Sequence, residues 1–361
     1  MISSDIEGVK ISGIACALPE RKVLSEEYND LFGEETVKKT VELTGVESTY
    51  HSVEKQTASD LAYAAAKHLL SERHTDPSEI GVLLFVGSHH DYIAPATAFV
   101  LQKRLEIPMN AIVFDINLGC SGFVYGLHTG ASLLKTTNAK KALVLLGDSS
   151  SRVVSPDDTS RLLFGDSGAA LLIEKTGSAE DVMKFGFRSD GSKFEDIYIP
   201  GGGYRHMDAT KELHEEEDGH RRSDYHSHMN GTEVFVFSVT DVPRLVRDFM
   251  SERKLDQNDI DMLFMHQPNL FILKNIVRKL KLPQEKVPFS IGQFGNTSGV
   301  SIPITMCDYY AGRNEGVKNM MLLGFGIGLS WGLAYLPVDT NVILPVIHSD
   351  EYYEDGLMDR S

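Results

Sequence analysis

The chain repeats part of its own sequence at a distance of 180 residues. The segment LSERHTDPSEIGVLLFV (70–86) has a counterpart in MSERKLDQNDIDMLFMH (250–266). Six residues of the first segment recur in the second, as the pairs Ser71/Ser251, Glu72/Glu252, Arg73/Arg253, Asp76/Asp256, Ile80/Ile260 and Leu83/Leu263. The chain therefore contains two copies of one structural unit, which limits the possible folds more than any single motif does.

Further along the chain, the two halves show the same elements in the same order. AIVFDINLGCSG (111–122) corresponds to VPFSIGQFGNTSG (287–299), and both predict a strand that passes through a small-residue turn into a helix. KALVLLGDS (141–149) corresponds to NMMLLGFGIG (319–328), and both predict a strand that ends in a Gly-containing turn. Continuous apolar strands that alternate with helices are typical of α/β units. We predict two such units packed back to back, with equivalent strand ends near each other.

Size, charge and cysteine content narrow the function classes. A chain of 361 residues with 42% hydrophobic residues can bury the cores of two domain-sized halves. The net charge of −16 argues against nucleic acid or an anionic membrane as a partner. Three cysteines are too few for a disulfide framework and indicate a reducing compartment. Without a signal-like N-terminus or a run of about 18 apolar residues, the chain is expected to be soluble and cytoplasmic.

Three reactive side chains lie at predicted strand ends, where α/β proteins usually bind ligands. Cys120 follows a strand and opens a helix, where exposed backbone N–H groups favour a thiolate. His266 ends the strand IDMLFM, and Asn296 lies in the turn GNTSG, which matches the turn of Cys120. A buried thiol, a core histidine and a plain turn are the structural alternatives. The combination of the three favours a catalytic site.

These three residues predict acyl transfer followed by condensation. Asn296 is neither a base nor a nucleophile, so we expect it to join His266 in donating hydrogen bonds to one thioester oxygen. Two donors would stabilise the enolate that remains when a malonyl group loses carbon dioxide, and that carbanion would attack an acyl group on Cys120. The acyl step needs its own oxyanion site, for which the backbone N–H of Cys120 and one from the turn at 324–328 are candidates.

The motifs resemble those of the β-ketoacyl-acyl carrier protein synthase III family, a branch of the thiolase superfamily, over nearly the whole chain. Five segments carry the resemblance, in family order: GCSGFVYGL (119–127), LLFGDSGAALLI (162–173), HQPN (266–269), GNTSGVSIP (295–303) and GFGIGLSWG (324–332). The resemblance implies a thiolase fold, with two duplicated βαβαβ-type halves packed as a five-layered αβαβα sandwich. It also implies an obligate homodimer and a two-step reaction without a metal or an organic cofactor.

The resemblance also assigns roles to individual residues. Cys120 is implied as the nucleophile, and His266 and Asn296 as the decarboxylation pair. Ile327, through its backbone N–H, is implied as an oxyanion donor, and Phe235 as a substrate contact.

Several positions depart from the family pattern and bear on the substrates. A Trp and an Arg that hold the adenine of coenzyme A in the family correspond to Lys39 and Leu43 here. An Arg ahead of the FGD segment corresponds to Asp158, with Arg161 nearby. These changes weaken the expected binding of adenine and make a carrier-protein thioester a plausible acyl donor, and the choice between it and a coenzyme A thioester stays open.

Further departures concern the acyl pocket and the docking surface. Ala94 replaces a bulky aromatic before Pro95, which predicts a roomier pocket and an acyl group longer than acetyl. Asn269 and Phe271 are expected to contact substrate, although Phe271 replaces an Arg that docks the carrier in the family. An acyl carrier protein, which is acidic, could still meet a basic helix surface formed by Lys274, Arg278 and Lys279.

The sequence divides into four parts. We predict an N-terminal half (1–180) with the nucleophile, a connecting region (181–230), a C-terminal half (231–338) with the histidine and asparagine, and an acidic extension (339–361) at the surface. Within the connecting region, the polar insertion 201–230 holds the acidic run 215–218 and five histidines: His206, His214, His220, His226 and His228. Their spacing fits no zinc motif, so we predict a solvated loop.

Three other functions compete with condensation. An acyltransferase on the same fold would move the acyl group to an alcohol or amine, and carbon dioxide release from a malonyl thioester distinguishes it. A cysteine protease also combines Cys, His and Asn, but its local signatures are missing and it has no place for a duplication. A silent partner subunit is disfavoured by the intact set of three residues. The pathway stays open, because fold-level analogy does not supply it.

Overall fold

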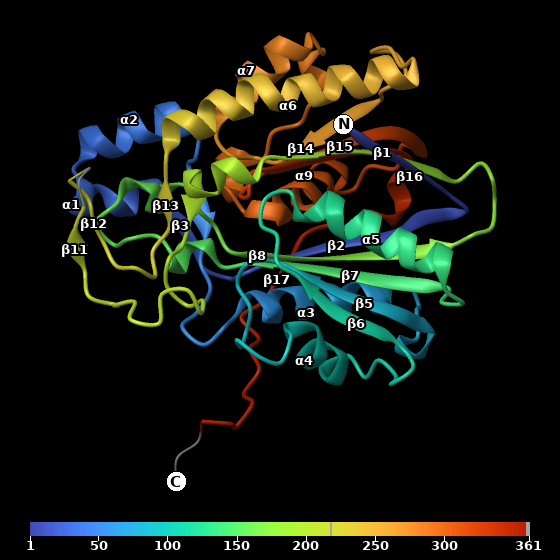
Figure 1. Cartoon of the computed structure of the whole chain (residues 1–361), viewed down its shortest axis with the longest axis horizontal. Coiled ribbons are helices and arrows are strands. Elements are labelled where there is room, and N and C mark those ends of the chain that lie inside the picture. Colours follow the sequence, from blue (N-terminus) through green and yellow to red (C-terminus); the bar gives the residue numbers. More distant parts are fainter. Residues whose placement is uncertain (217–218, 359–361) are drawn as a thin grey trace.

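Helices and sheets alternate in five layers in the computed structural model, which describes residues 1–216 and 219–358 (Figure 1). The six-stranded sheet has the order β17-β2-β8-β7-β5-β6 and the five-stranded sheet the order β1-β9-β16-β15-β14. The strands of the first sheet are β17 (Ile347–His348), β2 (Val9–Leu18), β8 (Ser167–Lys175), β7 (Lys141–Asp148), β5 (Ile80–Val86) and β6 (Ile112–Ile116). Those of the second are β1 (Ile2–Glu7), β9 (Val182–Ser189), β16 (Ser330–Asp339), β15 (Val317–Gly326) and β14 (Met262–Met265).

Helices cover both outer faces and fill the middle layer. The pair α3 (Ala58–Glu72) and α4 (Thr97–Arg104) covers the six-stranded sheet, and α6 (Gly231–Arg253) and α7 (Leu270–Leu280) cover the five-stranded sheet (Figure 1). Between the sheets lie α5 (Gly122–Thr136) and α9 (Ser301–Tyr310). The predicted αβαβα sandwich is confirmed. No described helix is both long and apolar enough to cross a membrane.

The middle helix α5 packs closely on the six-stranded sheet because one of its faces is made of glycines. Gly122, Gly126 and Gly130 are four residues apart and therefore lie on one side of the helix. A Cβ atom at any of them would come within 2.7 to 2.9 Å of Val86 or Val144 side-chain atoms. This close contact fixes the start of α5, and thus Cys120, relative to the sheet.

The second half departs from the predicted elements at one place. Residues 287–290, expected as a strand, form none; they lead into the short helix α8 (Ile291–Phe294), and Asn296 makes only an isolated bridge with Phe164. Pro288 has no N–H to donate to a ladder, which disfavours a strand there. The strand β15 pairs with β14 in parallel, as β7 pairs with β5 in the first half.

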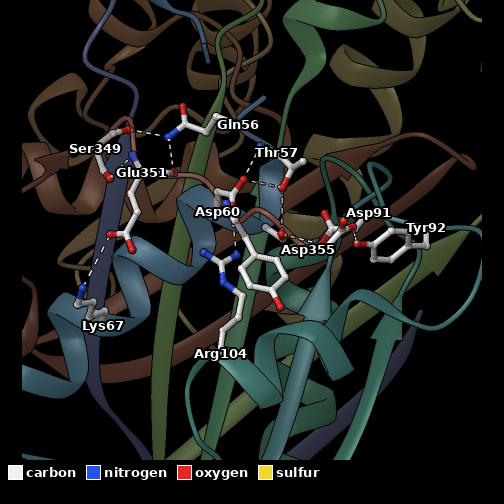
Figure 2. A network of polar contacts seen from close by, with 12 residues as sticks. Gln56, Thr57, Asp60, Lys67, Asp91, Tyr92, Arg104, Ser349, Glu351 and Asp355 are labelled. Atoms are coloured by element: carbon white, nitrogen blue, oxygen red, sulfur yellow. Dashed lines mark hydrogen bonds and ion pairs between the residues drawn. The ribbon is translucent and has the colours of Figure 1, made fainter. Parts of the chain in front are cut away.

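The C-terminal extension docks on the molecule through a polar network (Figure 2). Arg104 forms an ion pair with Asp60 at 2.7 Å, and both side chains are buried. The guanidinium of Arg104 lies 4.0 Å from the ring centroid of Tyr63 and 4.9 Å from that of Tyr353, a residue of the extension. The Tyr353 N–H also donates to Asp60 at 3.0 Å. The extension is therefore anchored at a buried ion pair between α3 and α4.

Candidate active site

Cys120, His266 and Asn296 line one cavity of about 790 Å³, together with Ile327. Each follows an element that fixes its backbone: Cys120 comes after β6, His266 directly after β14, and Asn296 directly after the turn that ends α8. The sequence places these residues up to 176 positions apart (120 to 296). The fold brings them together because equivalent ends of the two halves meet at the middle layer.

Ser298 contacts all three residues. Its hydroxyl is 3.6 Å from the Cys120 Sγ, its carbonyl oxygen is 3.0 Å from the His266 Nδ1, and its N–H donates to the Asn296 Oδ1 at 2.9 Å. The φ of Ser298 is 51°, which is unusual for a residue other than glycine. In this backbone conformation its hydroxyl, carbonyl and N–H each meet a different residue of the site. Sequence reasoning missed this residue. The only available signal was its place two positions after Asn296 in GNTSG.

Burial dominates the acidity of the Cys120 thiol. Removal from water raises its pKa to about 11, although the Ser298 hydroxyl and the backbone N–H groups of Cys120 and Ile327 act in the opposite direction. The negative charge of Asp148 raises the pKa further. The expectation of a thiolate at the helix start is therefore wrong for the resting site. The sulfur is a neutral thiol and needs a base.

The hydrogen bonds of His266 fix its tautomer. The Nδ1 atom lies 3.0 Å from the Ser298 carbonyl oxygen, which can only accept, and 2.8 Å from the Ser301 hydroxyl. The ring hydrogen is therefore on Nδ1, and Nε2 carries a lone pair. Burial lowers the pKa of His266 to about 4, so the ring is neutral near pH 7. In this state Nε2 accepts a proton, and it becomes the expected donor only after it has taken one.

Asn296 is oriented by its own turn. Its side-chain oxygen is occupied by the Ser298 N–H, which leaves the amide nitrogen as the group free to donate. Its backbone N–H donates to the Leu163 carbonyl at 2.7 Å. The residue is buried, with 6% of its surface exposed, so the amide has few alternative orientations.

The turn between β15 and β16 presents the Ile327 N–H to Cys120. Gly326 makes this approach possible, because a Cβ there would lie 2.6 Å from the Cys120 Cβ and 3.0 Å from its Sγ. Ser330 holds the turn by donating to the Ile327 carbonyl at 2.8 Å, and its hydroxyl meets that of Ser121 at 2.7 Å. The backbone N–H groups of Cys120 and Ile327 both act to lower the pKa of the thiol, so both lie beside the sulfur.

Part of the predicted solvated loop forms a wall of the cavity instead. Gly201, Gly202, Gly203, Tyr225, Ser227 and Met229 line the cavity. The segment is tied down by β10 (Ile197–Tyr198) pairing with β13 (His228–Met229), and by the Ser227 N–H donating to the Val153 carbonyl at 2.8 Å. The acidic residues Glu217 and Asp218 lie outside the described residues. Among the described residues, those of the insertion included, no three His, Cys, Asp or Glu side chains are grouped so that they could hold a metal ion.

Only one of the other four predicted substrate residues lines the cavity. Asn269 lines the cavity, and its side chain also accepts the Ile272 N–H at the start of α7. Phe235 and Phe271 stack on each other, with ring centroids 5.3 Å apart, and neither lines the cavity. Ala94 is exposed at the surface of the single chain and is also outside the cavity lining.

The predicted docking residues and Asp158 lie outside the cavity lining. Lys274, Arg278 and Lys279 are exposed along one side of α7. Asp158 is paired with Arg222 of the insertion at 2.9 Å. A guanidinium from the insertion therefore lies beside the position where the family pattern has an arginine.

A cysteine at a helix start, with a histidine and an asparagine from the duplicated half of a five-layered sandwich, defines a thiolase-fold condensing enzyme. Two family models match: "3-Oxoacyl-[acyl-carrier-protein (ACP)] synthase III" over residues 114–191, and its C-terminal counterpart over 250–338. The chain belongs to this family, and it is a condensing enzyme of the 3-oxoacyl synthase III type, a transferase.

Similar proteins support the family assignment over more than nine-tenths of the chain. The β-ketoacyl-[acyl-carrier-protein] synthase III of Clostridium perfringens is 32% identical over 92% of this chain and 99% of its own length. That of Rhodopirellula baltica is 33% identical over 91% and 98%. The crystal structure of a 3-oxoacyl-(acyl-carrier protein) synthase from Burkholderia xenovorans matches with a TM-score of 0.90 and 32% identity, over 96% of this chain and 99% of that one.

Proposed function

We propose that Cys120 accepts an acyl group and that His266 and Asn296 then drive its decarboxylative condensation with malonyl-acyl carrier protein, giving a 3-oxoacyl thioester. The observation that carries the proposal is the set of contacts of Ser298, which touches the sulfur, the imidazole and the amide at 3.6, 3.0 and 2.9 Å. All three groups are thereby held around one region of the cavity, as a two-step reaction at a single centre requires.

In the acyl step, His266 acts as the base. Its Nε2 lone pair takes the proton of the neutral Cys120 thiol, and the sulfur attacks the thioester carbonyl of the donor. The backbone N–H groups of Cys120 and Ile327 stabilise the negative charge that develops on the carbonyl oxygen. The departing thiolate takes this proton from His266, which is then neutral again, as its lowered pKa of about 4 requires.

In the condensation step, His266 and Asn296 act as donors. The negative charge of the malonyl group raises the pKa of His266, which takes a proton from water. The Nε2–H of the imidazolium and the amide N–H of Asn296 then bind the malonyl thioester oxygen while carbon dioxide leaves. The enolate carbon attacks the acyl group, the bond from carbon to the Cys120 sulfur breaks, and His266 gives its Nε2 proton to the sulfur. These side chains supply the chemistry of both steps, and neither step uses a metal or an organic cofactor.

The exposed side of α7 is the proposed docking surface for the acyl carrier protein. Lys274, Arg278 and Lys279 present positive charge there, on a chain whose net charge is −16. Lys39 and Leu43 occupy the positions at which the family pattern has a Trp and an Arg that hold adenine. Lys39 pairs with Glu35 at 2.7 Å and Leu43 is 59% exposed, so neither side chain replaces that adenine contact. We therefore favour a carrier-protein thioester as the acyl donor, with an acyl group longer than acetyl.

We further propose a homodimer that forms through the strand β6. This strand lies at the edge of its sheet, with β5 as its only strand neighbour among the described residues, and Ile112 is 37% exposed on it. An unpaired apolar edge favours pairing with a second copy. A cytoplasmic location is supported by Cys16 and Cys307, whose sulfur atoms lie 3.6 Å apart as free thiols.

Intact mass measurement tests the proposed reaction. The protein is incubated with acyl-carrier and acyl-coenzyme A thioesters, and malonyl-acyl carrier protein is then added. We expect an adduct that is lost in Cys120→Ala, and that malonyl carrier discharges with release of carbon dioxide. Asn296→Ala should form the adduct but discharge it about 100-fold more slowly. Asn341→Ala, outside the cavity, is the matched control. An adduct that ignores malonyl carrier would instead indicate transfer to an alcohol or amine.

Charge reversal tests the docking surface separately. In Lys274→Glu combined with Arg278→Glu, the KM for malonyl-acyl carrier protein should rise while kcat is retained, because the catalytic groups are untouched. Lys10→Glu combined with Lys140→Glu, two exposed positions outside α7, makes the same change in net charge and is the control. An unchanged KM would place the carrier on another surface.

A further inference from the structure

The cavity runs from one outer helix layer of the molecule toward the other. Asn269 and Ile272, at the start of α7, line it on the side of the proposed docking surface. Thr57, at the start of α3, and Tyr92 line it on the side of the opposite outer layer (Figure 1). Cys120 comes just before α5, in the middle layer between them. A carrier arm that enters past α7 therefore delivers an acyl group that extends beyond Cys120 toward Thr57 and Tyr92.

The segment 88–95, which includes Tyr92, has little support from its own backbone. In the described part of the chain, no residue of this segment takes part in a backbone–backbone hydrogen bond. Asp91 is held by Ser59, whose hydroxyl donates to its carboxylate at 2.8 Å. In the rest of the segment, the bond from the Tyr92 hydroxyl to the Asp355 carboxylate is the only hydrogen bond between described residues. The position of this wall therefore depends on the C-terminal extension, to which Asp355 belongs.

The extension also holds the cavity wall at Thr57, through the residues on both sides of it. One carboxylate oxygen of Asp60 accepts the Thr57 N–H at 2.8 Å, and the other accepts the Tyr353 N–H at 3.0 Å (Figure 2). The buried side-chain amide of Gln56 donates to two carbonyl oxygens of the extension, at 2.8 and 3.1 Å. One segment from the end of the chain therefore supports both Thr57 and Tyr92.

Polar contacts, rather than a hydrophobic core, hold the end of the extension on the molecule. No residue between 350 and 358 is buried. Lys55 pairs with Glu354 at 3.1 Å and Lys67 with Glu351 at 3.8 Å, all at exposed positions. Exposed ion pairs are weak, so they place the extension but leave it able to detach. The matched family models end at residue 338, so the shared family pattern does not include this stretch.

We propose that the C-terminal extension sets the upper limit on the length of the acyl group. An acyl group too long for the cavity needs the segment 88–95 to move outward, and this movement breaks the hydrogen bond between Tyr92 and Asp355. The rate with such a group is reduced to the fraction of molecules in which the segment has moved. The inference rests on the proposed acylation of Cys120 and specifies which donors the site accepts.

The test measures Cys120 acylation with straight-chain acyl-carrier donors from hexanoyl to hexadecanoyl, by intact mass before malonyl carrier is added. For the wild type we expect the rate to fall sharply beyond one chain length. Asp355→Ala, outside the cavity, should raise the rate with longer donors by about threefold to tenfold relative to hexanoyl, the range of one hydrogen bond. Tyr92→Phe should give the same increase, and the double variant no more than either alone, because both remove one contact. Glu354→Ala, with the same loss of charge one position earlier, is the matched control.

The outcomes separate the two proposals. A wild type that accepts hexadecanoyl as fast as hexanoyl would overturn the inference. An unchanged ratio of rates in Asp355→Ala and Tyr92→Phe would also overturn it, as would an equal increase in Glu354→Ala. Each of these results leaves acylation of Cys120 intact. Absence of an adduct from every donor would refute acylation of Cys120 and this inference with it.

Discussion

Replacement of Gly326 by alanine should disable the nucleophile without removing any reactive group. The new Cβ would lie 2.6 Å from the Cys120 Cβ and 3.0 Å from the sulfur, about 1 Å closer than ordinary carbon contacts allow. The turn at 326–328 must therefore move, and the Ile327 N–H moves with it. A displacement of about 1 Å at a reacting centre typically costs on the order of 100-fold in rate. Overpacking should also lower the free energy of unfolding by about 1–3 kcal/mol.

Two measurements check this reasoning. Denaturant unfolding gives the stability change, and intact mass gives the rate of Cys120 acylation. Gly231→Ala at the start of α6 is the control, because a Cβ there meets nothing within 4 Å. Acylation of Gly326→Ala at the wild-type rate would show that the turn does not need to lie against Cys120, and would remove Ile327 from the oxyanion site.

Three further predictions concern titration and the buried ion pair. The rate of Cys120 alkylation by iodoacetamide should keep rising with pH up to about 11, the pKa that burial imposes, and a plateau near pH 8 would contradict this. The His266 pKa of about 4 lies below the unfolded value of about 6.5, so neutral His266 contributes stability above pH 6.5 that is lost as pH falls through 4. Relative to His266→Gln, urea unfolding should show this loss, on the order of 3 kcal/mol. Arg104→Ala, which leaves Asp60 buried without its partner, should cost about 3–5 kcal/mol, whereas Lys39→Ala at an exposed pair should cost under about 1 kcal/mol in the same assay.

The positions of the reactive residues could be predicted because each has a signal in its neighbourhood. Cys120 and His266 end apolar runs, and a turn or helix start follows each, so the edge of the sheet could be inferred from the pattern of the strands. Asn296 was found through the repeat. The strand expected before it is absent, because Pro288 interrupts the ladder, but the position of the turn was still right. The turns of Cys120 and Asn296 therefore match between the two halves, although a strand precedes the first turn and a short helix the second.

Other features have no signal in a single sequence. Ser298 lies in a turn of small residues, and its role depends on a φ of 51° that composition does not reveal. Tyr225 and Met229 are separated by polar and charged residues, so no periodicity marks them as cavity residues. The pKa of the Cys120 thiol is set mainly by burial, to which the second half of the chain contributes, and a local sequence pattern does not reveal this. A helix start alone pointed to a thiolate, which is the opposite of what burial produces.

The docked extension has a consequence for how the protein is made. Tyr353 and Asp355 reach residues that are synthesised early, since Tyr353 meets Asp60 and Arg104, and Asp355 accepts the hydroxyl of Tyr92 (Figure 2). Tyr92 lies in a loop that lines the cavity. Because folding during synthesis begins at the N-terminus, this loop must wait until residues 353 and 355 have left the ribosome. A nascent chain can therefore complete both sheets while the wall of its cavity still lacks its final contact.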